Sequence, residues 1–183
     1  MKIIQTQLNE VYIIEADAFP DDRGIFVKIY NQEIFNEHKL NFQPKETYYS
    51  FSKKNVIRGM HFQTPPADHT KLVYVTQGKI LDVILDIRVG SPNYGKYITI
   101  ELSAENHKAI YIPSGFAHGF LSLQENSCVI YSQTAVYSPE NDNGININSF
   151  GMQWGIENPI VSKRDQNFQN FKDFKSSFIY KKP

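Results

Sequence analysis

The chain has 183 residues, and its 19 basic and 19 acidic side chains balance to a formal net charge of zero. This balance excludes a global field that attracts nucleic acid or a membrane surface, so we expect neither as a partner. Cys128 is the one cysteine, which excludes an intrachain disulfide and a thiolate zinc cluster. The sequence has no signal-like or membrane-spanning stretch, so we expect a cytoplasmic protein with a single domain over residues 1–183.

The first part of the chain predicts short strands and one helix. Residues 11–15 and 24–30 have the composition of strands and are separated by the turn-rich sequence FPDDRG. Asn31 is suited to cap a helix that runs through about Lys39, with Ile34 and Phe35 turned inward.

The middle of the chain predicts a series of strands. Residues 56–63 read VIRGMHFQ, and from 79 to 88 apolar residues alternate with Asp82, Asp86 and Arg88 after a Gln77-Gly78 turn. Further strands are expected at residues 97–102, 109–113 and 127–137. Many short strands with glycine and proline between them predict an all-β barrel or sandwich.

After Pro159 the pattern changes. Phe168, Phe171, Phe174 and Phe178 recur at a spacing that a helix allows. We therefore expect a C-terminal helical segment that packs across the barrel.

Two of the five histidines stand in contexts that favour chemistry. His61 follows Gly59, whose missing side chain allows a ligand or another backbone to approach closely, and His118 lies between small residues in SGFAHGF. A histidine in a strand is more often simply packed or solvated, and we expect solvated rings for the other three, which are His38, His69 and His107.

A metal site is not expected from these histidines. The position two residues after His61, where a metal-binding barrel often has a second histidine, is Gln63. His61 and His118 would supply only two ligands, which is fewer than a protein metal centre needs.

Tyrosines and charged residues complete the candidate chemistry. On an uninterrupted strand Tyr131 and Tyr137 would share one face, and a phenol can donate a proton or stack on a base or sugar. If the C-terminal segment folds back, Asp165 can accept a hydrogen bond from a histidine and fix its tautomer. The cations best placed to face a ligand are Arg23, Arg58, Lys71 and Arg164.

These residues lie in motifs that, in this order, resemble the dTDP-4-dehydrorhamnose 3,5-epimerase family over nearly the whole chain. The motifs are FPDDRGIF, VIRGMHFQ, KLVYV followed by GKILDVILDIR, SPNYG, YIPSGFAHGF, the Tyr131 strand ending in YSP, and VSKRD. The resemblance implies an all-β jelly-roll barrel of the cupin type with short peripheral and C-terminal helices, a homodimer, and no metal or cofactor. It also implies an epimerase that inverts C3, C5 or both in a nucleoside-diphosphate 4-keto-6-deoxy sugar.

The resemblance implies roles for individual residues. His61 would be the general base and Asp165 its partner, while Tyr131 would be the acid on the opposite face of the sugar. Lys71 would stabilise the enolate oxygen, with help from His118. The substrate-binding positions it implies are Arg23, Lys28, Glu46, Tyr48, Arg58, His118, Tyr137, Asp142 and Arg164.

The chain departs from the family pattern near the ligand. Lys28 stands where the family commonly has glutamate, Asp142 also replaces a glutamate, and Arg164 replaces a lysine. Residues 46–48 read Glu-Thr-Tyr in place of Gln-x-Asn. A thymidine nucleotide is the leading prediction for the substrate, and CDP- and GDP-linked sugars remain alternatives.

Three other functions fit parts of this pattern. A 3,4-ketoisomerase would use a similar histidine without needing Tyr131 on the opposite face. A non-catalytic sugar-nucleotide binding domain is disfavoured because His61, Asp165, Tyr131 and Lys71 are all retained. A metal-dependent cupin oxygenase is disfavoured by Gln63.

Overall fold

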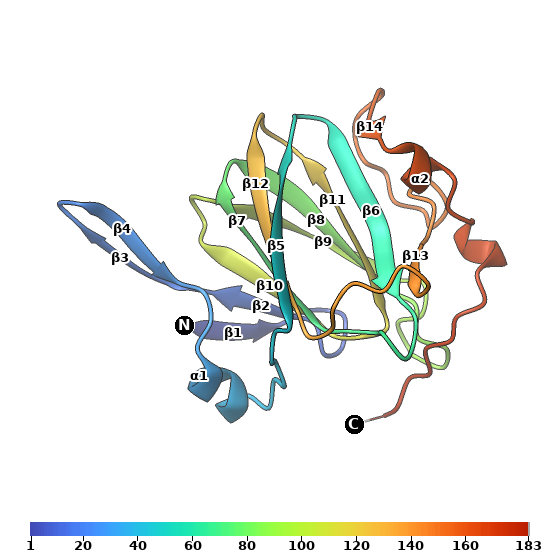
Figure 1. Ribbon diagram of the computed structural model, residues 1–183, viewed down its shortest axis with the longest axis horizontal. Coiled ribbons are helices and arrows are strands. Elements are labelled where there is room, and N and C mark those ends of the chain that lie inside the picture. The colour runs from blue at the N-terminus through green and yellow to red at the C-terminus, as the bar shows by residue number, and fades with distance from the viewer. Residues whose placement is uncertain (183) are drawn as a thin grey trace.

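Two mostly antiparallel sheets face each other in the computed structural model, which describes residues 1–182 (Figure 1). The first sheet has the strand order β1-β2-β10-β7-β12-β5, and the second has the order β13-β6-β11-β8-β9 with β14 against β6. A separate hairpin, β3–β4, projects away from the sandwich (Figure 1). The all-β architecture predicted from the sequence is confirmed.

The bounds of these elements agree with most of the predicted strands. The first sheet contains β1 (Lys2–Gln5), β2 (Tyr12–Glu15), β5 (Glu46–Ser52), β7 (Lys71–Gln77), β10 (Lys108–Ile112) and β12 (Ser127–Gln133). The second contains β6 (Val56–Gln63), β8 (Lys79–Asp86), β9 (Tyr97–Ser103), β11 (Phe116–Ser122), β13 (Asp142–Gly144) and β14 (Ile160–Val161). The remaining elements are β3 (Asp17–Asp21), β4 (Gly24–Lys28), helices α1 (Gln32–Glu37) and α2 (Lys163–Gln166), and a short 3-10 helix η1 (Phe171–Asp173).

The predicted helix cap is confirmed. The side chain of Asn31 accepts hydrogen bonds from the backbone N–H groups of Glu33 and Ile34, which have no partner within the first turn of α1. Phe35 is the buried residue of this helix and packs with Phe42 and Tyr111 on the outer face of the first sheet. This packing fixes α1 against the sandwich.

Strand β8 divides the apolar side chains between two layers. Val83, Leu85 and Ile87 belong to the cluster on the outer face of the second sheet, whereas Ile80 and Ile84 belong to the cluster between the sheets. This is the period-two alternation expected for a strand that is buried on both faces. The buried carboxylates Asp82 and Asp86 therefore point into the interior with Ile80 and Ile84.

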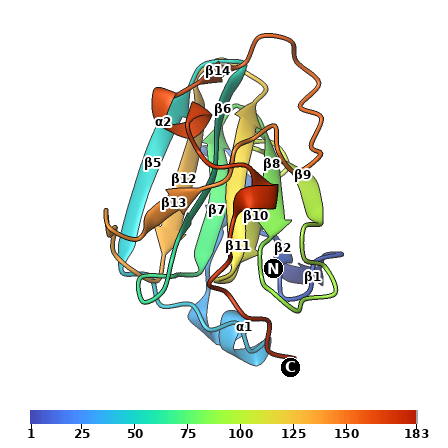
Figure 2. The same cartoon turned by 90° about the vertical axis from the view of Figure 1, so that its right-hand side faces the viewer.

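The helical segment predicted from the spacing of the four phenylalanines is wrong, whereas the short C-terminal helices implied by the resemblance are confirmed. Beyond Pro159 the chain has only the short helices α2 and η1, and most of the segment runs in extended form along the outer face of the second sheet (Figure 2). Its phenylalanines fill gaps in that face, where the rings of Phe174 and Phe178 pack against Phe62. Packing against a flat sheet, rather than helical amphipathicity, explains their spacing.

A second correction concerns β12. The strand ends at Gln133, so Tyr131 and Tyr137 do not share one strand face. Beyond it the chain turns away, and the backbone N–H of Tyr137 donates to the side chain of Glu46 at 2.8 Å, outside the strand ladder. Tyr137 therefore approaches the interior from a loop.

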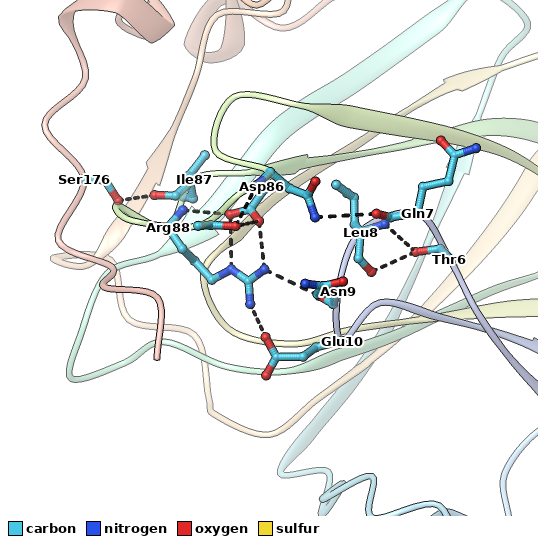
Figure 3. A network of polar contacts seen from close by, with 11 residues as sticks. Thr6, Gln7, Leu8, Asn9, Glu10, Asp86, Ile87, Arg88 and Ser176 are labelled. Atoms are coloured by element: carbon cyan, nitrogen blue, oxygen red, sulfur yellow. Dashed lines mark hydrogen bonds and ion pairs between the residues drawn. The ribbon is translucent and has the colours of Figure 1, made fainter. Parts of the chain in front are cut away.

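Arg88 holds three parts of the chain together at the end of β8 (Figure 3). Its guanidinium donates to Asp86 Oδ1 at 3.1 Å and to Asp86 Oδ2 at 2.7 Å, and it also binds Glu10 and the carbonyl of Asn9. The ring of Tyr180 from the C-terminal segment lies 4.9 Å from the guanidinium carbon. The N-terminal loop and the C-terminal segment are thereby fixed to the same strand.

Within residues 1–182, no helix is both long enough and apolar enough to span a bilayer.

Candidate active site

A cavity of about 400 Å³ lies between the two sheets. The second sheet contributes residues of β6 and β11, and the first contributes residues of β5, β7 and β12. The residues that line it are Glu46, Tyr48, Ser50, Arg58, His61, Phe62, Gln63, His69, Lys71, His118, Phe120, Tyr131, Gln133, Tyr137, Asp142 and Arg164.

A bulge in β6 brings two polar side chains to this cavity. From the pair His61–His118 to the next pair, which contains Arg58, β6 advances three residues while β11 advances two. On a regular strand Arg58 and His61 would face opposite sides, and the extra residue turns both toward the cavity. Gly59 lies in the bulge, where an added Cβ would come within 2.7 Å of the Gly119 Cα. The close approach of another backbone, one of the two expected for Gly59, is therefore confirmed.

His61 is hydrogen-bonded to a buried carboxylate. Its Nε2 lies 2.9 Å from Asp165 Oδ1, and Asp165 Oδ2 accepts a hydrogen bond at 3.2 Å from the backbone N–H of Gly59. Ser162, the N-cap of α2, accepts from the backbone N–H of Asp165 at 3.0 Å. The carboxylate is thus held by the β6 bulge from one side and by the start of α2 from the other.

This arrangement sets the protonation of the pair. Burial lowers the pKa of His61 below 6.5, although the hydrogen bond to Asp165 opposes the shift. Burial disfavours the ionised form of Asp165, but the hydrogen bonds from His61 and Gly59 outweigh it and lower its pKa. Since an ionised carboxylate can only accept, His61 Nε2 carries the proton and Nδ1 keeps its lone pair.

His118 forms a second histidine–carboxylate pair deeper in the sandwich. It lies opposite His61 on β11, and its Nε2 is 2.7 Å from Asp82 Oδ1. Burial raises the pKa of Asp82, while His118 and the ammonium group of Lys71 oppose this shift. Asp82 Oδ2 has no hydrogen-bond partner among residues 1–182.

Lys71, the first residue of β7, places a buried ammonium group in the cavity wall. Its Nζ donates to the carbonyl of His61 at 3.4 Å. Burial lowers the pKa of Lys71 to about 8, although the carboxylates of Asp142 and Asp82 favour the charged form. The group is therefore charged at neutral pH and retains protons for a ligand.

Tyr131 faces the cavity from the first sheet. Its hydroxyl lies 3.4 Å from Ser50 Oγ, and its ring stacks on Tyr48 with centroids 4.9 Å apart. Burial strongly raises the pKa of Tyr131 above 10, so the phenol stays protonated at neutral pH. The ring of His118 lies 6.2 Å away across the cavity.

The remaining charged residues of the lining form hydrogen bonds or ion pairs with neighbouring groups. Arg58 donates to Ser52 Oγ and to the Phe51 carbonyl, both at 3.1 Å. Arg164 forms an ion pair with Asp142 at 2.7 Å. Glu46 accepts from the Gln133 amide at 2.7 Å, so this carboxylate orders the rim as well as lining it.

Two predicted binding residues lie outside this cavity. Arg23 and Lys28 belong to the projecting β3–β4 hairpin, and the Arg23 side chain is 89% exposed and paired with Asp21. Neither residue lines the cavity of its own chain. All other predicted catalytic and binding residues line it, except Asp165, which lies behind His61.

Sequence reasoning missed several polar residues here, among them Ser50, His69 and Asp82. The prediction of a solvated His69 is wrong, because this residue is only 9% exposed and lines the cavity. Asp82 was placed on the polar face of β8 but was not paired with His118. A carboxylate alternating with core residues on a buried strand is the signal that could have identified it. Among residues 1–182, no group of three or more His, Cys, Asp or Glu side chains is arranged to hold a metal ion.

The cavity is suited to moving a proton on a carbon next to a carbonyl. A neutral imidazole on one sheet faces a protonated phenol on the other, and a buried ammonium lies beside the imidazole. These features suit an isomerase reaction, in which a proton leaves a carbon and is returned to it.

Comparison with known proteins identifies the family. The family model described as dTDP-4-dehydrorhamnose 3,5-epimerase matches residues 5–173. The Escherichia coli epimerase of this name is 41% identical over 91% of this chain and 92% of its own. The crystal structure of the Elizabethkingia anophelis epimerase matches with a TM-score of 0.89 at 38% identity, covering 94% of this chain and 97% of that chain. A Legionella pneumophila 3,5-epimerase in complex with dTDP-4-keto-L-rhamnose matches with a TM-score of 0.92 at 31% identity, covering 99% of both chains.

The chain belongs to the dTDP-4-dehydrorhamnose 3,5-epimerase family. The predicted cupin-type jelly roll is confirmed by these structural neighbours.

Proposed function

We propose that this protein inverts C3 and C5 of dTDP-4-dehydro-6-deoxyglucose by removing and returning a proton at each carbon. The observation that carries the proposal is the placement of His61 and Tyr131 on opposite sheets around one cavity. The dTDP-4-keto-L-rhamnose bound to the Legionella relative supports the nature of the substrate.

His61 is proposed to remove the proton. The C4 ketone of the sugar acidifies the C–H bonds at C3 and C5, and Nδ1 of the neutral imidazole accepts the proton from the carbon. The C–H electron pair moves into a C–C double bond, and the carbonyl becomes an enolate oxygen. Asp165 stabilises the imidazolium that forms, because it accepts the Nε2 hydrogen bond throughout.

Lys71 is proposed to stabilise the enolate oxygen, with His118 beside it. Preorganised donors aimed at developing charge contribute most in a site from which water is largely excluded. The Lys71 ammonium is buried and charged at neutral pH, and it makes only one long hydrogen bond within residues 1–182. It can therefore donate to the enolate oxygen without giving up a strong partner.

Tyr131 is proposed to return a proton from the opposite face. Its O–H bond breaks as the C–C double-bond electrons form the new C–H bond, and an electron pair of the enolate oxygen restores the ketone. The phenolate then regains a proton from solvent, and His61 loses its own proton in the same way. Delivery from the face opposite His61 is what inverts the carbon.

Arg58 and Arg164 are proposed to hold the diphosphate. Both guanidinium groups lie among the lining residues, and guanidinium matches phosphate geometry. The aromatic side chains of Tyr48 and Tyr137, also in the lining, offer stacking faces for the base or the sugar.

We also propose a homodimer of single-domain subunits in which the β3–β4 hairpin contacts the partner. The hairpin exposes Phe19, Ile25 and Phe26, and apolar side chains gathered on a projecting arm favour burial in an interface. Docking of the arm would bring Arg23 and Lys28 to the neighbouring cavity. These two residues would then bind the nucleotide sugar of the partner subunit.

A complementation assay tests this arrangement. The His61→Ala and Arg23→Ala variants should each be impaired alone, and mixed dimers should regain activity, since the Arg23→Ala subunit would receive an intact Arg23 from its partner. A monomer in light scattering, or no gain on mixing, would refute the shared site.

Incubation of the protein in heavy water with dTDP-, CDP- and GDP-linked 4-keto-6-deoxy sugars tests the reaction. We expect deuterium at C3 and C5 of the dTDP sugar with inverted configuration in the NMR spectrum. Deuterium at one carbon would indicate a single-centre epimerase, and a 3-keto product would indicate a ketoisomerase. The absence of exchange with every substrate would contradict the proposal.

A further inference from the structure

His69 is a buried histidine that the proposed mechanism does not use. It lies directly before β7, two residues from Lys71, and only 9% of it is exposed. Its Nε2 is fully buried and has no hydrogen-bond partner among residues 1–182. A buried ring nitrogen without a partner costs free energy, which indicates that something other than this chain satisfies it.

The surroundings of His69 fix its tautomer. The Gln63 Oε1 accepts from the backbone N–H of Ser138 at 2.7 Å, so the Gln63 amide nitrogen points the other way. Its two protons have carbonyl acceptors in Ala67 at 2.8 Å and Val136 at 3.3 Å. His69 Nδ1 lies 3.2 Å from the Gln63 amide nitrogen and 3.3 Å from the Ala67 carbonyl. Because both amide protons have carbonyl acceptors, we assign the ring proton to Nδ1, which donates to the Ala67 carbonyl. Nε2 is left as an acceptor.

A small cavity of about 10 Å³ has His69 and Lys71 among its lining residues. Its volume is about that of one water molecule. Two of its lining residues offer complementary groups, an acceptor at His69 Nε2 and a donor in the Lys71 ammonium. The residues that line it are Phe62, Gln63, His69, Lys71, Ser114, Gly115, Phe116 and Phe178.

We propose that His69 is a positioning residue for Lys71, whose ammonium donates to His69 Nε2 through one water molecule in this cavity. The functional meaning of the inference rests on the proposed role of Lys71 at the enolate oxygen. The hydrogen bond favours the charged form of Lys71 and holds its Nζ against the wall opposite the substrate. Without this hydrogen bond, fewer interactions would oppose the lowering of the Lys71 pKa by burial.

Other groups that face Lys71 act in the same direction or are neutral. The carboxylates of Asp82 on β8 and Asp142 on β13 favour the ammonium. His61 on β6 supplies a carbonyl, and the phenol of Tyr131 on β12 lies in the same wall. None of these groups changes when His69 is substituted, so a change in Lys71 reports on His69.

The direct test is the titration of Lys71 in the substrate-free protein, followed by NMR of lysine side chains labelled at Cε. The Lys71→Arg variant assigns the signal. In His69→Phe, which keeps a ring without an acceptor, we expect the Lys71 midpoint to fall by about one pH unit. His69→Leu serves the same purpose if the larger ring does not fold. His69→Gln, which keeps an acceptor, should lie between these variants and the wild type, and His38→Gln, at an exposed histidine, should show no change.

An unchanged or higher Lys71 midpoint in His69→Phe or His69→Leu would overturn the inference. Because the titration needs no substrate, this failure is separate from a failure of the proposed function. A protein that titrates as expected but exchanges no deuterium would contradict the epimerase proposal and leave the His69–Lys71 contact standing.

Discussion

Arg88 and Lys71 are both buried cations beside carboxylates of β8, yet their surroundings differ. The Arg88 guanidinium donates to Asp86, Glu10 and the Asn9 carbonyl, and the Phe116 ring covers it at 4.2 Å. Lys71 makes one hydrogen bond of 3.4 Å within residues 1–182, and the nearby Asp82 Oδ2 and His69 Nε2 have no partner there. The first cluster is saturated and binds chain segments together, whereas the second leaves donors and acceptors for a ligand.

The comparison distinguishes a buried charge that stabilises the fold from a buried charge that is available to a ligand. A satisfied buried charge stabilises the structure, and its removal leaves its partners unpaired. An unsatisfied buried charge destabilises the structure, and proteins retain such groups where a function requires them. Removing Arg88 should therefore mainly lower stability, whereas removing Lys71 should mainly lower activity.

The largest expected effect on activity belongs to His61. In His61→Ala, no neighbouring group can accept the carbon proton, and general-base catalysis typically contributes about 10²- to 10⁴-fold. We expect deuterium exchange to fall by about this factor. Exchange at the wild-type rate would refute the assignment of the base.

The largest expected effect on stability belongs to Arg88. Arg88→Met would leave the buried Asp86 carboxylate without its partner, which typically costs about 3–5 kcal/mol in the free energy of unfolding. Urea denaturation measures this loss. As a control, Lys108→Met removes an ion pair to Glu15 of 3.8 Å near the surface and should change stability by less than about 1 kcal/mol. An equally small loss in Arg88→Met would remove the contrast on which the comparison depends.

Lys71→Met should behave in the opposite way. Methionine has a similar length and does not need to keep a charge in a buried site, so we expect unfolding free energy that is equal to or above that of the wild type. Exchange should nevertheless fall about 10²-fold or more, because the enolate loses its cation. If the variant instead unfolds as easily as Arg88→Met, then Lys71 is a structural residue.

The pH dependence of activity should report on His61 and Lys71, with smaller effects than the substitutions have. The His61 base must be neutral, and burial lowers its pKa below 6.5, so activity should persist below pH 6.5 before it falls. Lys71 must be charged, and burial lowers its pKa to about 8, so kcat/KM should fall as the pH rises through about 8.

The same Lys71 shift affects stability with a defined sign. Between pH about 8 and the ordinary value of 10.5, the unfolded chain binds more protons at Lys71 than the folded chain does. This group should therefore make the protein more stable as the pH rises through that window. The trend should be absent in Lys71→Met, and urea midpoints at a series of pH values measure the difference. The same rise in Lys71→Met would assign the trend to another group.

Much of the fold could be predicted because its signals are local. The alternation in β8, the Asn31 cap and the Gln77-Gly78 turn each depend on residues close together in the sequence. The C-terminal helix was predicted wrongly because Phe174 and Phe178 follow the shape of the sheet beneath them. Such spacing reflects tertiary contacts that no local pattern contains.

The candidate active site likewise has features that could be predicted from the sequence and features that could not. His61, His118 and Tyr131 lie in motifs that resemble a known family, so their common cavity could be expected. The resemblance also implies that Arg58 and His61 act at one site, but strict alternation assigns them to opposite faces, and only the bulge at Gly59 reconciles the two. The burial of His69 depends on Gln63, Ala67 and the cavity around it, none of which a polar sequence context reveals.

The central claim is that a base and an acid act from opposite sides of the sugar. Tyr131→Phe in heavy water tests it most directly, with Tyr49→Phe, at an exposed tyrosine of β5, as the matched control. We predict that Tyr131→Phe still incorporates deuterium at C3 or C5 but returns the sugar with its original configuration, because His61 both removes and returns the proton. Inverted product formed at the rate of the wild type would contradict the account.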